Sequence, residues 1–266
     1  DSPVSPTVAL MELLHANCLG AGGKPFIVLH GFLGMGDNWK SLAKFWVTQG
    51  YAIHLLDQRN HGRSFWSSEF SYPLLAEDVL RYMDYYGLEN PIILGHSMGG
   101  KTAMTLATAF PDRVSKLIVA DIAPKHYPPH HDQILKGLAA LDFDKVKSRS
   151  EADHALANFI TDAGTRQFLL KNLYWVDKKR LGLRINIEVL KGVSEAIGAG
   201  LSENSCFTGP ALFLAGELSP YIQSEDHALI KKHFPQSTLI NVPKAGHWLH
   251  AENPNFFSEQ MLLWLD

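Results

Sequence analysis

Several features that mark particular classes of protein are scarce in this sequence. Only two of its 266 residues are cysteine, too few for a disulfide framework, and no Cys/His cluster indicates structural zinc. We therefore expect a reducing, cytoplasmic location. No apolar run approaches the roughly 18 residues that a membrane span needs. The first residues lack the basic region of a secretory signal, so we expect no signal peptide.

An excess of positive charge is also missing. The chain has 24 Lys and Arg against 27 Asp and Glu, a net charge of -3. Such a chain has no general attraction for nucleic acid or for anionic lipid. Hydrophobic residues make up 46% and charged residues 19%, a balance typical of globular proteins and not of disordered ones. The length fits one large domain, or one domain with an inserted lid.

Short apolar runs alternate with longer helical patterns. Strands are expected at 26–30, 52–57, 91–95, 117–121, 211–215 and 238–242, with a further edge strand over 11–17. Helices are expected at 39–48, 73–86, 98–110 and 254–265. The central runs are apolar at successive positions, as in parallel strands that are covered on both faces. This alternation predicts an α/β fold with a mostly parallel, doubly wound sheet.

One long interval, residues 124–205, interrupts this alternation. It holds no strong buried strand, and helical patterns fill it at 132–141, 151–162, 166–173 and 188–197. Prolines mark its beginning, and glycines followed by Pro210 mark its end. We interpret it as a helical cap inserted into a core that is formed by residues 1–123 and 206–266.

The strongest motif is the sequence Gly95-His96-Ser97-Met98-Gly99, which lies between a predicted strand and a predicted helix. A serine in such a tight strand-to-helix turn presents its hydroxyl as a nucleophile, and small residues two positions before and after it relieve the crowding. The N–H of Met98 then points toward a developing oxyanion. Phe32, in the turn after the first predicted parallel strand, is the candidate for the second oxyanion donor.

The same segment supports a competing hypothesis. Residues 95–102 read GHSMGGKT and match the phosphate-loop pattern GxxxxGK[ST]. In an ATPase, Lys101 would bind phosphates, and Asp121 at the end of a buried strand would bind magnesium. The hydrolase interpretation is preferred because it explains further segments.

One of these segments follows the last predicted strand and contains His247. The chain order of this kind of active site is serine, acid, histidine, and His247 satisfies it. For the acid we favour Asp121, which ends a strand beside the Ser97 turn. Glu217 and Asp226 are alternatives, because the acid often follows the strand before the histidine. If Asp121 is not the acid, its role is to cap its own loop.

Other polar segments are expected to be structural. Residues 57–64 carry Asp, Arg and Asn side chains suited to turn amides. Adjacent polar residues at 130–132 rarely converge on one ion, so no metal site is expected. The residues proposed to line a substrate pocket are Leu33, Phe143, Phe159, Trp175 and Trp248.

Taken together, the motifs resemble those of a known family. The segments are HGFLGMGDNW, DQRNHGRS, GHSMGGKTAM, VADIAP, GELSPY and AGHWLHAENP. They are similar to the α/β-hydrolase fold, and more narrowly to the YbfF-type bacterial esterases and the related animal α/β-hydrolase domain-containing protein 11. The resemblance implies a Ser97–His247–Asp121 triad that hydrolyses small carboxylic esters, or acyl-CoA thioesters, without a cofactor. A non-catalytic, ligand-binding member of the fold is the alternative.

Overall fold

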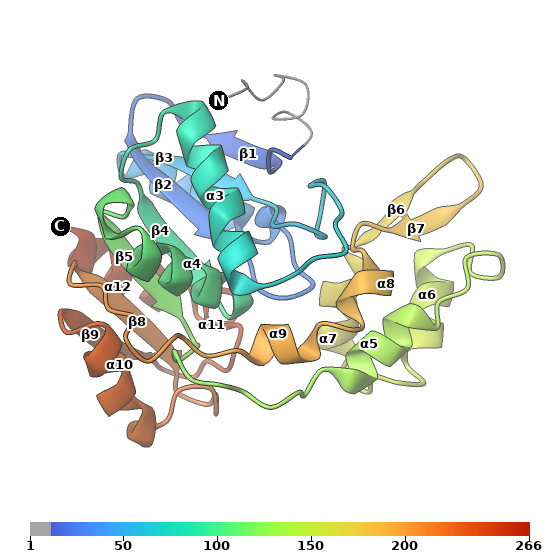
Figure 1. The fold of residues 1–266 in the computed structure, drawn as a ribbon. Helices are drawn as coiled ribbons and strands as arrows, with labels where there is room; N and C mark the ends of the chain where they lie inside the picture. The colour runs from blue at the N-terminus through green and yellow to red at the C-terminus, as the bar shows by residue number, and fades with distance from the viewer. Residues whose placement is uncertain (1–11) are drawn as a thin grey trace.

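The computed structural model describes residues 12–266, and a seven-stranded sheet forms its centre (Figure 1). The strand order is β1-β3-β2-β4-β5-β8-β9, and every neighbouring pair is parallel except β1 with β3. The strands are β1 (Ala16–Leu19), β2 (Lys24–Leu29), β3 (Tyr51–Leu56), β4 (Ile92–His96), β5 (Lys116–Ala120), β8 (Ala211–Gly216) and β9 (Ser237–Val242). The predicted α/β sheet is confirmed; the predicted edge strand begins later than expected, and Met11 lies outside the described residues.

Helices cover both faces of the sheet, because alternate side chains of each strand point to opposite sides. Ile27 and Leu29 of β2 pack with the helices of one face, and Phe26 and Val28 with those of the other. The first face carries α3 (Tyr72–Tyr86), α4 (Met98–Ala109) and α10 (His227–His233). The second carries α2 (Lys40–Thr48) and α12 (Pro254–Leu265). Of these helices, only α10 was not predicted.

The strand order reverses between β2 and β4, since β3 lies on one side of β2 and the chain then crosses to β4 on the other. In open α/β sheets, the crevice at the carboxyl ends of the strands beside such a reversal is the usual ligand site. The turns after β2 and β4 meet there. The turn after β2 covers residues 30–34, and the turn after β4 contains Ser97.

The segment between β5 and β8 forms a separate group of short elements, to the right of the sheet in Figure 1. They are α5 (Asp132–Ala139), α6 (Arg149–Leu156), α7 (Ala163–Leu170), β6 (Leu173–Trp175), β7 (Leu181–Leu183), α8 (Ile187–Leu190) and α9 (Ser194–Gly198). This group, called the cap below, has its own hydrophobic cluster, which includes Leu138, Leu156 and Leu170.

The β6–β7 hairpin corrects the expectation of a purely helical cap. Its strands have three residues each, too few for a periodic pattern to be recognised. Asp177 closes the turn by accepting the backbone N–H groups of Lys179 and Arg180. The predicted single helix over 188–197 is also divided, into α8 and α9. No helix in residues 12–266 has the length and apolar character needed to cross a membrane.

Candidate active site

Ser97 occupies a strained turn between β4 and α4. Its backbone has φ 55° and ψ -116°, a region that side-chain-bearing residues rarely adopt. The flanking glycines are required by close contacts: a Cβ at Gly95 would lie 2.0 Å from the carbonyl oxygen of Gly99, and one at Gly99 would lie 2.1 Å from that of Leu29. The turn thus holds the Ser97 hydroxyl at the carboxyl edge of the sheet.

His247 contacts both Ser97 and Asp121. Its Nδ1 lies 2.7 Å from Asp121 Oδ2, and its Nε2 lies 2.9 Å from Ser97 Oγ. A carboxylate oxygen accepts this hydrogen bond, so Nδ1 carries the proton and its N–H donates the bond to Asp121. Nε2 is then left to accept a hydrogen bond from the Ser97 hydroxyl.

Asp121 is fully buried directly after β5, with a left-handed φ of 53°. Besides His247 it accepts the backbone N–H of Gly216 at 3.0 Å and the hydroxyl of Ser219 at 2.5 Å. Three donors therefore surround the carboxylate, which compensates for the loss of water around it. Ser219 lies in the loop where the acid would usually be expected, and it supports the carboxylate of Asp121 instead.

The two alternative acids have other partners. Glu217 accepts the backbone N–H of Lys244 at 2.7 Å. Asp226 accepts the backbone N–H of Gln223 and forms an ion pair with Lys125 at 2.8 Å. Neither carboxylate is hydrogen-bonded to His247.

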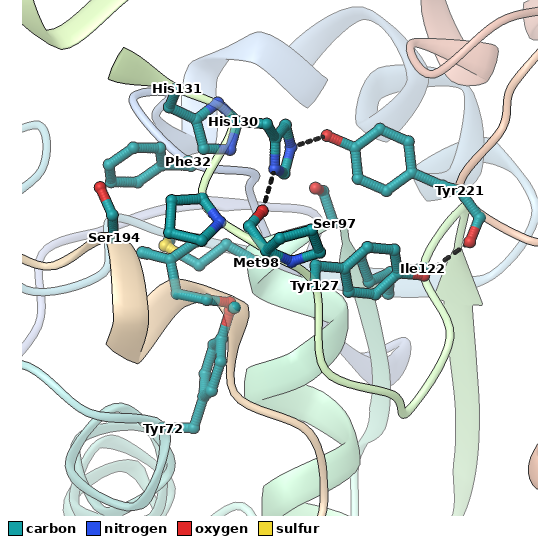
Figure 2. Close-up of a pocket in the computed structure, with 14 residues that line it drawn as sticks. Phe32, Tyr72, Ser97, Met98, Ile122, Tyr127, His130, His131, Ser194 and Tyr221 are labelled. Carbon is teal, nitrogen blue, oxygen red and sulfur yellow. Dashed lines mark hydrogen bonds between the residues drawn. The ribbon is translucent and has the colours of Figure 1, made fainter.

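Phe32 and Met98 line the same cavity as Ser97 (Figure 2). Within residues 12–266, neither backbone N–H donates to another group of the protein. Leu33, the residue after Phe32, has a left-handed φ of 66° and donates its N–H to His61 Nε2 at 3.1 Å. Both N–H groups therefore lack a partner among the described residues and are available to a bound oxygen atom.

The segment predicted to be structural holds this loop in place. His61 donates its Nδ1–H to the carbonyl of Arg59, which leaves Nε2 unprotonated and able to accept the Leu33 N–H. Burial, and secondarily the neighbouring His30, lower the pKa of His61 to about 3, so its ring stays neutral. Asp57 accepts the backbone N–H groups of Gly36 and Arg63, as expected for a turn.

Tyr221 is a contact of His247 that the sequence did not reveal. Its ring stacks on the imidazole with centroids 3.8 Å apart and planes 14° apart. Its hydroxyl is 2.5 Å from His130 Nε2, a contact drawn in Figure 2. Burial, followed by the charge of Asp121, raises the pKa of Tyr221 to about 12, so the phenol remains neutral. The unusual Ser-Pro-Tyr after β8 was the only available signal.

Two cavities meet at Ser97, and Phe32 and His131 border both. The first, of about 380 Å³ including its open mouth, is also lined by Tyr72, Ile122, Tyr127, Ile197 and Tyr221. The second, of about 580 Å³ on the same measure, is also lined by Trp39, Ile134, Phe168, Leu169 and Trp248. Both cavities therefore border the Ser97 side chain.

The predicted pocket residues divide into two groups. Leu33 and Trp248 line the second cavity. Phe143 and Phe159 instead pack against the cap's hydrophobic cluster, and Trp175 on β6 is 56% exposed. The sequence shows that aromatic residues occur in the cap, but it does not show which face of a short helix turns toward Ser97. For this reason it could not separate pocket residues from cap-core or exposed ones.

The side chains of the phosphate-loop pattern are committed to other contacts. Lys101 is buried, and its ammonium donates to two backbone carbonyls. The Thr102 hydroxyl donates to Gln58 Oε1 at 2.9 Å. The ATPase alternative requires these groups to bind phosphate and magnesium, and neither is available to do so.

Comparison with known proteins identifies the family. The family model described as the alpha/beta hydrolase fold matches residues 24–254. The chain belongs to the α/β-hydrolase fold family. This α/β-hydrolase is 37% identical over 246 residues to the mouse (Mus musculus) sn-1-specific diacylglycerol lipase ABHD11, covering 90% of this chain and 80% of the relative.

Two further relatives confirm the predicted YbfF-type resemblance. Esterase YbfF of Escherichia coli strain K12 is 34% identical over 232 residues, covering 87% of this chain and 89% of the relative. A solved structure named as a marine microorganism esterase superposes with a TM-score of 0.92 at 40% identity, covering 95% of this chain and 99% of the other. This α/β-hydrolase therefore groups with esterases and lipases of the family.

Proposed function

We propose that this protein is a serine carboxylesterase in which Ser97, His247 and Asp121 form the catalytic triad. The observation that carries the proposal is the position of His247, which contacts the Ser97 hydroxyl through one ring nitrogen and the Asp121 carboxylate through the other. A base between a nucleophile and an orienting acid is the general requirement for covalent acyl transfer.

In the proposed reaction, Ser97 Oγ attacks the carbonyl carbon of the ester while His247 Nε2 takes its proton. Asp121 keeps the imidazole in the required tautomer and stabilises the imidazolium that forms. The N–H groups of Phe32 and Met98 bind the negative oxygen of the tetrahedral intermediate. His247 then gives the proton to the departing alcohol, which leaves an acyl group on Ser97.

A water molecule completes the cycle. His247 accepts a proton from the water as it attacks the acyl-enzyme, and the collapse of the second tetrahedral intermediate returns the proton to Ser97 and releases the acid. All of these steps use side chains and backbone groups of this chain.

The two cavities support a substrate with an apolar group on each side of the ester bond. We propose that one cavity holds the acyl group and the other the alcohol, with the bulkier of the two in the larger, second cavity. The names of the relatives, a diacylglycerol lipase and an esterase, agree with ester substrates. Acyl-CoA thioesters are the other substrate class implied by the resemblance, since the same triad cleaves them.

The test is hydrolysis of p-nitrophenyl acetate and butyrate by the parent protein, with Ser97→Ala as the control. We expect turnover by the parent and almost none by the variant. If the purified, folded parent hydrolyses neither these esters nor a series of acyl-CoA thioesters, the protein is instead a non-catalytic ligand-binding member of the fold. Comparing the two series at matched chain length decides between ester and thioester.

A further inference from the structure

The ammonium of Lys101 lies in the interior of the protein, one helical turn after Ser97. Its side chain is 1% exposed, and the backbone N–H of Lys101 bonds to the carbonyl of Ser97 at the start of α4. Nζ donates to the carbonyl oxygen of Lys125 at 2.6 Å and to that of Ala199 at 2.5 Å. A buried lysine is costly unless it is well compensated, so these contacts call for an explanation.

The two carbonyls belong to the two segments that join the cap to the sheet. Residues 124–127, which follow β5, and residues 198–201, which lead toward β8, are called the stalk below. Two backbone hydrogen bonds pair them, from Tyr127 N to Gly198 O at 2.8 Å and from Leu201 N to Pro124 O at 3.0 Å. The stalk is therefore a single paired structure.

The stalk segments are too close together for side chains between them. A Cβ at Gly198 would lie 2.1 Å from the carbonyl oxygen of Tyr127, and a Cβ at Gly200 would lie 2.9 Å from the backbone nitrogen of His126. With no side chains to interlock there, the position of the stalk depends on contacts from the core. Lys101 makes one such contact to each segment, and the Tyr72 hydroxyl donates to the carbonyl of Ile197, the residue before the second segment, at 2.6 Å.

The surroundings of the ammonium are aromatic and weakly charged. The ring centroids of Tyr127 and Tyr72 lie 5.2 and 5.8 Å from Nζ, within the range of cation–π attraction. The charged neighbour is Lys125, which is paired with Asp226. Burial, and then the charge of Lys125, lower the pKa of Lys101 to about 7. Both the ammonium and the neutral amine have enough N–H groups to donate to two carbonyls.

We infer that Lys101 is a positioning residue that fixes the stalk, and with it the cap, relative to Ser97. The stalk residues Tyr127 and Gly198 line the first cavity, together with the adjacent Ile197. The helix that follows Ser97 thereby positions part of the wall of the cavity that Ser97 also lines. Lys101 touches no reacting atom in this scheme, and the inference rests on the proposed function only where activity is the readout.

The primary test is amide hydrogen exchange in Lys101→Met, which keeps the length of the side chain and removes its donors. We expect the amides of Tyr127 and Leu201 to exchange at least about tenfold faster than in the parent, and amides of β4 to be unchanged. Lys116→Met is the matched control, because Lys116 also donates to a backbone carbonyl, that of Leu265, far along the chain from the stalk. It should leave the stalk amides unchanged.

A structural role without positioning would give a different pattern. Removing a buried charge can leave the global stability unchanged or raise it, so faster exchange of the stalk alone distinguishes local release from general loosening. If Tyr127 and Leu201 exchange at parental rates in Lys101→Met, or if β4 accelerates equally, the inference is wrong.

Activity provides a second, independent readout. In Lys101→Met we expect the KM for esters with bulky groups to rise about tenfold, and the rate of Ser97 labelling by a small fluorophosphonate to stay within about threefold. An equal loss of labelling would place the effect on the triad and overturn the inference. Failure of the parent to be labelled would contradict the proposed function alone, because the exchange experiment does not depend on catalysis.

Discussion

The two sides of the site are built in different ways. On the core side, Phe32, Met98 and Asp121 come directly or within three residues after the neighbouring parallel strands β2, β4 and β5, which are hydrogen-bonded along their lengths. On the cap side, the residues that face Ser97 come from short helices and irregular segments, which a few side-chain contacts tie to the core. In the proposed function, the reacting groups therefore come from the core, and the cap adds residues to the walls of the two cavities. Substitutions on the two sides should therefore change different kinetic constants.

The largest effect should come from Ser97→Ala, on the core side. Removal of the nucleophile should lower kcat by on the order of 10⁶-fold, by analogy with serine proteases. Only a hydroxyl is lost, so the folded structure should persist, which circular dichroism and thermal unfolding can verify. Ester hydrolysis within tenfold of the parent would contradict the assignment of Ser97.

Asp121→Asn should give the next largest loss. The amide presents the wrong hydrogen-bond partner to His247, which in a triad costs about 10⁴-fold in kcat. We expect a loss of at least about 10²-fold, since the Ser219 and Gly216 contacts keep the side chain in place. Glu217→Gln is the matched control, and steady-state kinetics should find it within tenfold of the parent. A larger loss for Glu217→Gln than for Asp121→Asn would reverse the assignment of the acid.

Acid should destabilise the core through its buried histidines. Burial lowers the pKa of His30 to about 4 and that of His250 to about 3, against 6.5 for an unburied histidine. Below pH 6.5 the unfolded chain binds protons that the folded chain does not, so the free energy of unfolding falls. Each such histidine then costs up to about 1.4 kcal/mol per pH unit until its folded pKa is reached.

Urea unfolding measures this effect directly. The free energy of unfolding should be level above pH 7 and should fall steadily between pH 6.5 and 4.5. A free energy that stays constant over that range would show that these rings are protonated in the folded protein.

The smallest effect should come from the cap. Phe168 lines the second cavity and packs against Trp248, with ring centroids 5.0 Å apart. Phe168→Ala should raise the KM for esters with bulky groups about tenfold, the scale of a lost apolar pocket contact, and leave kcat nearly unchanged. Trp175→Ala, in an exposed cap aromatic, is the control and should stay within about twofold. A kcat loss in Phe168→Ala that exceeds its KM change would contradict the proposal that the cap affects substrate binding and not the chemical step.

The difference between the regular core strands and the irregular cap also determines how much of the structure the sequence could predict. The core strands are successive apolar residues such as Ile92-Ile93-Leu94, and the motifs at their ends have fixed spacings, so the sheet and the turn at Ser97 were predicted within a few residues. The predicted acid, Asp121, is hydrogen-bonded to His247 because the carboxyl ends of parallel strands meet.

The remaining features depend on loop conformation, which leaves no periodic signal. The supporting contacts of Ser219 and Tyr221 arise because the loop after β8 folds back over Asp121 and His247. The three-residue strands of the β6–β7 hairpin are too short for recognition. Lys101, which the sequence shows only as part of a phosphate-loop pattern, is buried because the stalk covers it.

The most direct test of the account is covalent labelling of the parent with a fluorophosphonate, followed by intact mass and peptide mapping. The triad proposal predicts one phosphonyl group per chain, located on Ser97, with ester hydrolysis lost in proportion to the labelled fraction. A fully folded parent that stays unlabelled, a label on another residue, or full activity in labelled protein would contradict the central claim that Ser97 is the nucleophile of a serine hydrolase.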